Sequence, residues 1–236
     1  MHCTLYIVPT PIGNLEDITL RAIRVLREVD TVVCEDTRQT IKLLSHLKIS
    51  KPLISFYTQN QLRRIPQIIS MLEAGKNIAL VSDCGTPAIS DPGYYLIKEA
   101  LEHNINIVPL PGACALITAI VASGLPTDSF VFLGFLKRKP GKMRKELDAA
   151  KQLEKAVIFY ESPHRLLKTL EICREVFGDN ANVVLARELT KKFEEFIRGS
   201  LQKVSDNLQN REILGEFVVL IEPCKLSVGD NDNDEQ

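Results

Sequence analysis

Short runs rich in β-branched residues alternate through the first half of the chain with stretches that repeat apolar residues every three or four positions. The candidate strands are Leu5–Val8, Thr31–Val33, Leu53–Phe56, Ile78–Val81 and Ile105–Pro109. The helical spacing between them is clearest around residues 18–29, 65–72 and 94–102. This order of strands and helices predicts a parallel sheet with helices on both faces.

A further helix over 113–123 is predicted to end at Gly124, with Pro126 beyond it. The second half then gives strands at Phe130–Leu133, Ala156–Tyr160, Val183–Arg187, Glu195–Arg198 and Phe217–Ile221, and helices at Met143–Leu153, Pro163–Phe177 and Leu201–Leu208. Its last strands follow one another closely, which predicts a mixed sheet. We therefore expect two α/β domains, over 1–124 and 125–225, and a disordered acidic tail over 226–236.

The net charge of −1 gives the chain no general attraction to nucleic acid or membrane, so a charged partner must be bound by a local patch. No apolar run is long enough to span a bilayer, and the N-terminus enters a strand pattern directly. These features predict a cytoplasmic protein without a membrane partner. The six cysteines include no CxxC pair and the four histidines show no ligand spacing, so neither a metal nor a disulfide framework is expected.

The segment Val81–Gly93 contains two Gly, two Pro, two Asp and two Ser directly after a predicted buried strand. It is either a plain turn or a binding loop, because α/β proteins hold ligands at the carboxyl ends of their strands. Similar loops follow other strands, at Val8–Leu15, Cys34–Arg38, Leu110–Ala115, Phe159–Arg165 and Ala186–Lys191. There is no Walker A motif and no GxGxxG before a helix, which disfavours ATP and NAD. Backbone amides, prolines and small side chains are compatible with S-adenosylmethionine, but they do not by themselves single it out.

In these loops the chain resembles the tetrapyrrole-methylase superfamily. The motifs that carry the resemblance are Pro9–Leu15, Glu35–Arg38, Ser82–Pro87, Ser90–Gly93, Phe159–Arg165 and Ala186–Lys191, in the family's order over about residues 4–222. More narrowly, they are similar to the superfamily's ribosomal branch, the small-subunit methyltransferases. This resemblance implies S-adenosylmethionine-dependent 2′-O-methylation of a cytidine ribose in the decoding region of 16S rRNA, within the 30S subunit, by a homodimer.

Five positions depart from the pattern of that branch. Cys84 stands where Ala is usual, and Ala113-Cys114 replaces Pro-Ser. These are changes between small residues, which a pocket built from backbone should tolerate. Lys137 replaces a Pro, and Phe193 stands where a His is common. Phe193 removes a titratable group, which puts in doubt a role in proton transfer at that position.

The resemblance also implies a set of cofactor contacts. They are Pro11, Ile12, Ser82, Asp83, Cys84, Gly85, Thr86, Pro87, Cys114, Ala115 and Tyr160. Asp83 either contacts the cofactor's amino acid or ribose, or caps a turn by an Asx bond, or does both. Gly85 and Gly112 either permit close approach of backbone or satisfy a turn that needs a positive φ.

A ribose 2′-hydroxyl is a poor nucleophile unless a base within hydrogen-bond reach takes its proton. Asp36 is the first candidate, because superfamily relatives carry an Asp at the matching place that is assigned this role. Glu161 and Glu188 are the next candidates. Each of the three could instead pair with a nearby arginine, and alignment of the reactants alone could suffice.

The segment Lys137–Lys145 holds six basic residues in nine and no acidic one. It is either an exposed basic loop without a particular function or, given the resemblance, an arm that contacts RNA phosphates. Six contacts to single-stranded RNA would give a slope of log K against log salt of roughly −4. The residues expected to bind substrate are Asn14, Arg38, Arg138, Lys139, Lys142, Arg144, Lys145, His164 and Arg165.

Two other functions compete with this interpretation. The first is methylation of carbon on a corrin or sirohaem precursor by another enzyme of the superfamily, which would have no need of a cluster of cations. The second is a non-catalytic ribosome assembly factor, which would have no need of several preserved loops around a cofactor site.

Overall fold

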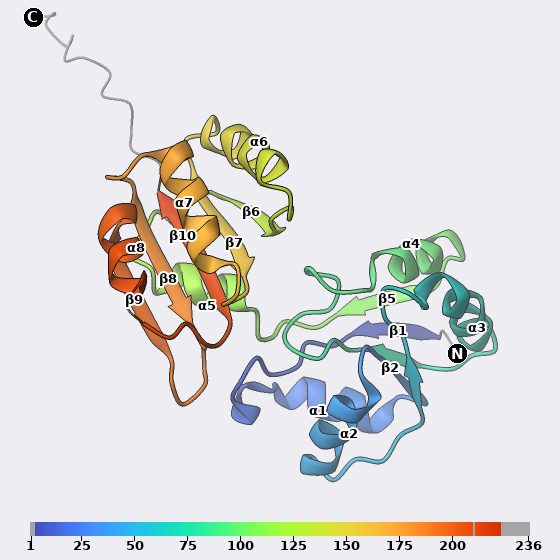
Figure 1. Ribbon diagram of the computed structural model, residues 1–236. Helices are drawn as coiled ribbons and strands as arrows, with labels where there is room; N and C mark the ends of the chain where they lie inside the picture. Colours follow the sequence, from blue (N-terminus) through green and yellow to red (C-terminus); the bar gives the residue numbers. More distant parts are fainter. Residues whose placement is uncertain (1–2, 210, 223–236) are drawn as a thin grey trace, which may run out of the picture. The chain divides into compact units, whose positions relative to one another are not determined.

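The computed structural model describes residues 3–209 and 211–222, and its contacts divide the chain into two compact units between Ala115 and Leu116. The sequence predicts a domain boundary after Gly124 instead, which places residues 116–124 in the first domain. The tail expected over 226–236 lies outside the described residues. Figure 1 shows the elements of each unit.

The described part of the first unit is built on a five-stranded sheet in the order β3-β2-β4-β1-β5. Its strands are β1 (Thr4–Ile7), β2 (Thr31–Cys34), β3 (Leu53–Ser55), β4 (Ile78–Leu80) and β5 (Asn106–Pro109). Every neighbouring pair is parallel, which confirms the predicted sheet. Because the strands are parallel, the loops that follow them all lie at one edge.

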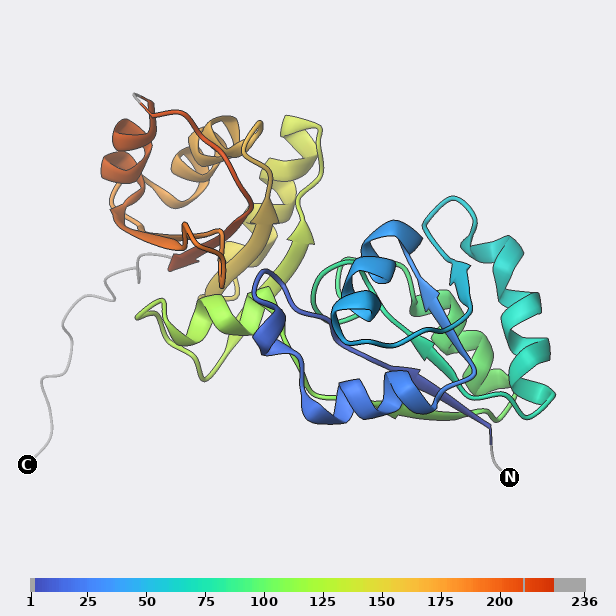
Figure 2. The same ribbon diagram turned by 90° about the horizontal axis from the view of Figure 1, so that it is seen from below.

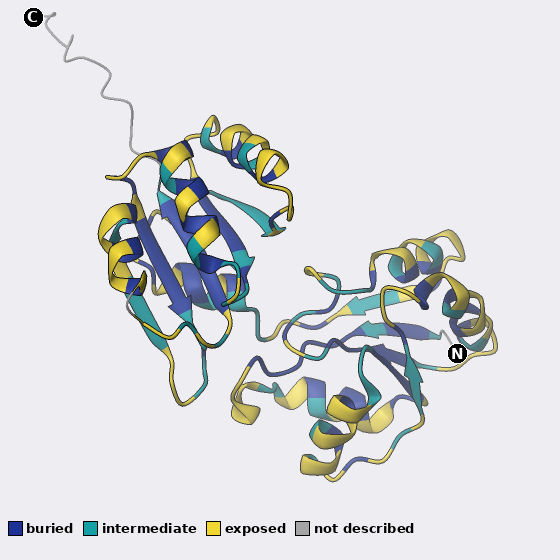
Figure 3. Cartoon of the chain, viewed as in Figure 1, coloured by how far each residue is buried: buried dark blue, intermediate teal, exposed yellow. Residues whose placement is uncertain are grey.

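Helices cover both faces of this sheet, as the alternation of patterns predicts. They are η1 (Leu15–Asp17), α1 (Leu20–Glu28), α2 (Thr37–His46), α3 (Gln61–Glu73) and α4 (Tyr94–Glu102). Buried apolar residues of α1 and α2 pack with one set of alternate strand residues, and those of α3 and α4 pack with the other set. Figure 3 shows the buried strands between helices that are exposed on their outer sides. Helix α2 was not predicted, because its first residues were interpreted as part of a loop.

The second unit is built on a mixed sheet in the order β6-β7-β10-β8-β9. Its strands are β6 (Phe130–Phe135), β7 (Ala156–Glu161), β8 (Asn182–Arg187), β9 (Glu195–Ser200) and β10 (Phe217–Glu222). The β6–β7 pair is parallel and the other pairs are antiparallel, so the prediction of a mixed sheet is confirmed. Its helices are α5 (Ala115–Val121), α6 (Pro140–Lys151), α7 (Leu166–Phe177) and α8 (Leu201–Gln209).

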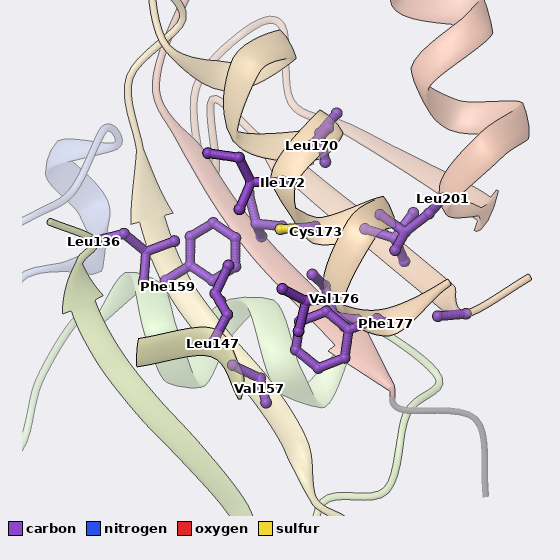
Figure 4. Close-up of a cluster of buried hydrophobic side chains, with 14 of the residues drawn as sticks. Leu136, Leu147, Val157, Phe159, Leu170, Ile172, Cys173, Val176, Phe177 and Leu201 are labelled. Atoms are coloured by element: carbon purple, nitrogen blue, oxygen red, sulfur yellow. The ribbon is translucent and has the colours of Figure 1, made fainter. Parts of the chain in front are cut away.

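Helices α6, α7 and α8 share one apolar core with the sheet of the second unit. Figure 4 shows this core, with Phe159 of β7 among side chains from α6 and α7. Helix α5 lies on the opposite face of the sheet, as Figures 1 and 2 show.

Much of the basic segment Lys137–Lys145 is helical rather than a loop. Helix α6 begins within it, at Pro140, and proline suits the first position of a helix.

Substitution of Phe159 tests how far this core stabilises the second unit. The side chain is fully buried, so Phe159→Ala should lower the free energy of unfolding by about 3–5 kcal/mol. Phe193 is 65% exposed, so Phe193→Ala should cost less than about 1 kcal/mol. Urea denaturation followed by circular dichroism measures both, and equal losses in the two variants would contradict the assignment of the core.

Candidate functional site

The loop after β4 is fastened to the loop after β1 by a short antiparallel bridge at the carboxyl edge of the first sheet. The amide of Thr10 donates to the carbonyl of Gly85 at 2.9 Å, and the amide of Gly85 donates back at 3.0 Å. The buried Thr10 hydroxyl donates to the carbonyl of Ser82 at 3.1 Å. Three hydrogen bonds therefore fix the backbone of Ser82–Gly85 relative to the end of β1.

The same loop is also tied to the loops that follow β2 and β5. Thr86 Oγ1 donates to the carbonyl of Ala113 at 3.0 Å. The amide of Asp36 donates to Asp83 Oδ1 at 3.0 Å. The segment after β4 thus contacts all three neighbouring loops, and it is the central element of the candidate site.

Two glycines allow these loops to approach one another, for different reasons. Gly85 has a φ of 82°, and a Cβ there would lie 3.2 Å from Ile12 Cγ2. At Gly112, a Cβ would lie 2.6 Å from Pro9 Cβ, which is too close for any side chain. Gly85 therefore meets both a turn requirement and a close contact, and Gly112 meets a close contact.

The expected cofactor residues of the first unit lie in these loops. They are Pro11, Ile12, Ser82, Asp83, Cys84, Gly85, Thr86, Pro87, Cys114 and Ala115. Cys84 is exposed and Cys114 is half-buried. Tyr160 lies in the second unit, where its hydroxyl accepts a hydrogen bond from the amide of Leu116 at 3.3 Å and its ring packs edge-to-face with Phe132.

Three carboxyl groups close to one another give the edge of the first sheet a concentration of negative charge. Burial, together with the nearby carboxylates of Glu35 and Asp83, raises the pKa of Asp91 to about 7. Burial and neighbouring carboxylates likewise raise the pKa of Glu35 and of Asp83 above their ordinary values. Asp91 was not among the predicted site residues, because its pKa depends on burial and on the carboxylate of Glu35, which lies in a different loop.

Asp36 forms both an ion pair and a helix cap. Its carboxylate accepts from Arg38 Nε at 3.0 Å and from Arg38 Nη2 at 2.7 Å. It also accepts from the amide of Arg38 at 2.8 Å, as the N-cap of α2. Hydrogen bonds from Arg38 lower the pKa of Asp36 to about 2, so in this arrangement the carboxylate is a weak proton acceptor.

Glu161 and Glu188, the other two candidates for a base, are occupied by contacts within the second unit. Glu161 is 2% exposed and accepts from the amide of Ser162 at 2.8 Å and from Thr169 Oγ1 at 2.7 Å. Glu188 accepts from the amide of Glu216 and from Lys191 Nζ, each at 3.0 Å. Burial raises the pKa of Glu188, but these two donors outweigh burial, so its pKa is lowered.

The expected substrate residues are divided between the two units. Asn14 caps η1, and Arg38 is largely exposed beside Asp36. The others lie in the second unit, around the starts of α6 and α7: Arg138, Lys139, Lys142, Arg144, Lys145, His164 and Arg165. Arg144 pairs with Glu175, and Arg165 with Glu161.

Within residues 3–209 and 211–222, no group of three or more His, Cys, Asp or Glu side chains could hold a metal ion. None of the helices in this part of the chain has the length and apolar character needed to cross a membrane.

Residues 4–205 match the family described as Tetrapyrrole (Corrin/Porphyrin) Methylases. The chain belongs to this family. It is therefore a methyltransferase, and the resemblance inferred from the loop motifs is confirmed. The chain is 49% identical to the ribosomal RNA small subunit methyltransferase I of Halalkalibacterium halodurans, over 93% of this chain and 75% of that protein. It is also 49% identical to the protein of the same name from Bacillus subtilis, over 92% and 74%.

Solved structures of methylases share the fold. The chain superposes on a cobalt precorrin-4 methyltransferase with a TM-score of 0.71 at 16% identity, covering 92% of this chain and 94% of that chain. A uroporphyrin-III C-methyltransferase from Thermus thermophilus, complexed with S-adenosyl homocysteine, gives a TM-score of 0.64 at 17% identity, covering 92% and 96%.

Asp91→Asn tests the concentration of negative charge at the sheet edge. The folded pKa of about 7 lies above the ordinary 3.8, so wild-type stability should fall as pH rises through this interval. Asp91→Asn should therefore be more stable than wild type at about pH 8, by about 1–2 kcal/mol after allowance for partial exposure. The gain should vanish near pH 4.

Thermal or urea unfolding at several pH values measures this gain. Asp17→Asn, at an exposed position of the same unit, is the matched control and should show no such trend. An Asp91→Asn gain that is independent of pH would contradict the assigned pKa.

Proposed function

We propose that this chain transfers a methyl group from S-adenosylmethionine to the ribose 2′-hydroxyl of a cytidine in the decoding region of 16S rRNA, within the 30S subunit. The observation that carries the proposal is the 49% identity, over almost the whole chain, to proteins named ribosomal RNA small subunit methyltransferase I. Cations near the start of α6, such as Arg138, have no ion pair within the described part of the chain, and they also favour RNA over a macrocycle. A 30S substrate would place the protein in the cytoplasm.

The chemistry of the first unit's loops fits S-adenosylmethionine. Val81–Gly93 contains no Lys or Arg, so it offers no side-chain cation to neutralise a phosphate. The carboxyls of Glu35, Asp83 and Asp91 instead favour a ligand with positive charge. S-adenosylmethionine carries a sulfonium and an ammonium group, and ribose hydroxyls that can donate to carboxylates. We assign it to Pro11, Ile12, Ser82–Pro87, Cys114 and Ala115 of the first unit.

S-adenosylmethionine, when bound, supplies a methyl group that needs no activation by the protein. The chain must then hold the 2′-hydroxyl in line and accept its proton. We assign the proton to Asp36. Arg38 is 85% exposed, so an RNA phosphate can draw it away, and the pKa of Asp36 then rises from about 2 toward its ordinary value. Glu161 and Glu188 are weaker candidates, because backbone amides already occupy them.

Asp36→Asn should lower kcat by about 10²–10⁴-fold, because it removes the proton acceptor. Its affinity for S-adenosylmethionine should stay within about twofold of wild type, as should that of the control Asp17→Asn. Single-turnover methylation and calorimetric titration measure the two quantities. A kcat for Asp36→Asn equal to wild type would show that alignment of the reactants suffices.

Arg38→Gln tests whether the ion pair with Arg38 sets the pKa of Asp36. Loss of the guanidinium should raise the pKa of Asp36 in the free enzyme, so the acid limb of kcat/KM should move to higher pH. The measurement is the pH profile of kcat/KM for both proteins with the same 30S preparation. An unchanged acid limb would exclude Asp36 as the group that titrates.

Methyl transfer from labelled S-adenosylmethionine to 30S subunits from cells lacking this gene tests the function itself. We expect a single 2′-O-methylcytidine in the decoding region, mapped by cleavage that is sensitive to ribose methylation. No transfer with cofactor still bound would favour a corrin or sirohaem precursor as substrate. No binding of cofactor would favour an assembly factor.

We also propose a homodimer, on the strength of the family resemblance. Light scattering at micromolar concentration should give about twice the 26.5 kDa mass of one chain. A mass of one chain under these conditions would contradict the proposal.

A further inference from the structure

The second unit contains a cavity of about 260 Å³ between the start of α6 and the first half of α7. Its lining residues are Arg138, Pro140, Met143, Arg165, Lys168, Thr169 and Ile172. The two helices pack against each other, so the cavity is bounded by elements of one unit only. It is several times larger than the roughly 30 Å³ that one water molecule occupies in the liquid.

Of the residues that the structure describes, three cations and no acidic residue line this cavity. Within the described residues, Arg138 and Lys168 have neither an ion pair nor a side-chain hydrogen bond, and both are exposed at its rim. On a chain with a net charge of −1, three converging cations indicate a site for an anion. Lys168 lies outside the basic segment 137–145 and was not among the predicted substrate residues.

A buried carboxylate beneath the cavity holds the third cation in place. Arg165 Nη2 lies 3.4 Å from Glu161 Oε2 and donates to the carbonyl of Leu136 at 3.1 Å. Thr169 Oγ1 donates to the same Glu161 oxygen at 2.7 Å. Glu161 offsets one of the three positive charges, and Arg138 and Lys168 remain for a ligand. Glu161 is therefore a positioning residue for the wall of this cavity.

We propose that this cavity, which we call the α6–α7 pocket, binds a phosphate of the RNA backbone, with the attached ribose lying on Met143 and Ile172. The proposal rests on the proposed function. Guanidinium groups match the geometry of phosphate oxygens. The positive end of the α6 dipole also favours an anion, and the N-cap of α6, Lys139, makes no side-chain hydrogen bond to the first turn.

The lining of the α6–α7 pocket also indicates what it does not recognise. Among the described residues it contains no aromatic side chain on which a base could stack, and no Asn or Gln that could pair with a base edge. Its contacts therefore go to phosphate and sugar, which fix the register of an RNA strand without reading its sequence.

Lys168→Gln tests the pocket, with Lys203→Gln as the matched control. Lys203 is an exposed lysine of α8 in the same unit and does not line the pocket. Equilibrium binding of the whole protein to 30S subunits is measured at several salt concentrations. Lys168→Gln should bind about 3–10-fold more weakly, and its slope of log K against log salt should be smaller by about 0.7.

Two further variants test whether the positive charges of the pocket contribute to binding. Arg138→Gln should weaken binding as Lys168→Gln does, whereas Lys168→Arg keeps the cation and should bind within about twofold of wild type. Equal affinity of Lys168→Gln and wild type would overturn the proposal. An equal loss in Lys203→Gln would also overturn it, because general attraction would then explain the effect.

If the proposed function is wrong, the wild-type protein will not methylate 30S subunits. The α6–α7 pocket can then still be tested as an anion site, with inorganic phosphate as the ligand. Phosphate should raise the Tm of wild type more than chloride of equal ionic strength does, and this excess should be absent in Lys168→Gln. The same excess in both proteins would overturn the pocket as an anion site.

Discussion

The paired hydrogen bonds between the backbones of Thr10 and Gly85 fix the loop after β4 against the end of β1, and the candidate cofactor site depends on them. From this position, Asp83 accepts a hydrogen bond from the loop after β2, and Thr86 donates one to the loop after β5. The central place of β4 in the sheet makes this possible, because a loop at its end can contact loops on both sides. Small residues and glycines are needed here because the backbones approach one another closely.

The charges of the two units are suited to different ligands. In the first unit, carboxyl groups lie close enough together to raise one another's pKa, which favours a cationic ligand. In the second unit, cations converge on the α6–α7 pocket, which favours an anion. A methyl transfer from a sulfonium to RNA requires both kinds of binding. This division explains how a chain with a net charge of −1 could bind a polyanion through a local patch.

The sequence predicted both sheets well, because the alternation of strand and helix patterns and the spacing of the last strands carry that information. Helix α4 was predicted with the bounds it has, Tyr94–Glu102. Helix α2 was missed, because Asp36 was interpreted as a loop carboxylate when it is also an N-cap. The pKa of Asp91 and the lining of a cavity by Lys168 depend on contacts between distant segments. A lysine on an amphipathic helix is most simply interpreted as part of a solvated face, so no local signal could have singled out Lys168.

We propose that the loop after β4 organises the cofactor site through its hydrogen bonds to neighbouring loops. Calorimetric titration of S-adenosylmethionine into Thr86→Val, which loses the bond to Ala113, tests it most directly. Thr4→Val is the matched control, because the Thr4 hydroxyl accepts a hydrogen bond from Asn106 Nδ2 at the opposite edge of the same sheet. We expect Thr86→Val to bind about 3–10-fold more weakly and Thr4→Val to bind as wild type does. Equal affinity of Thr86→Val and wild type would show that the hydrogen bond to Ala113 does not organise the cofactor site.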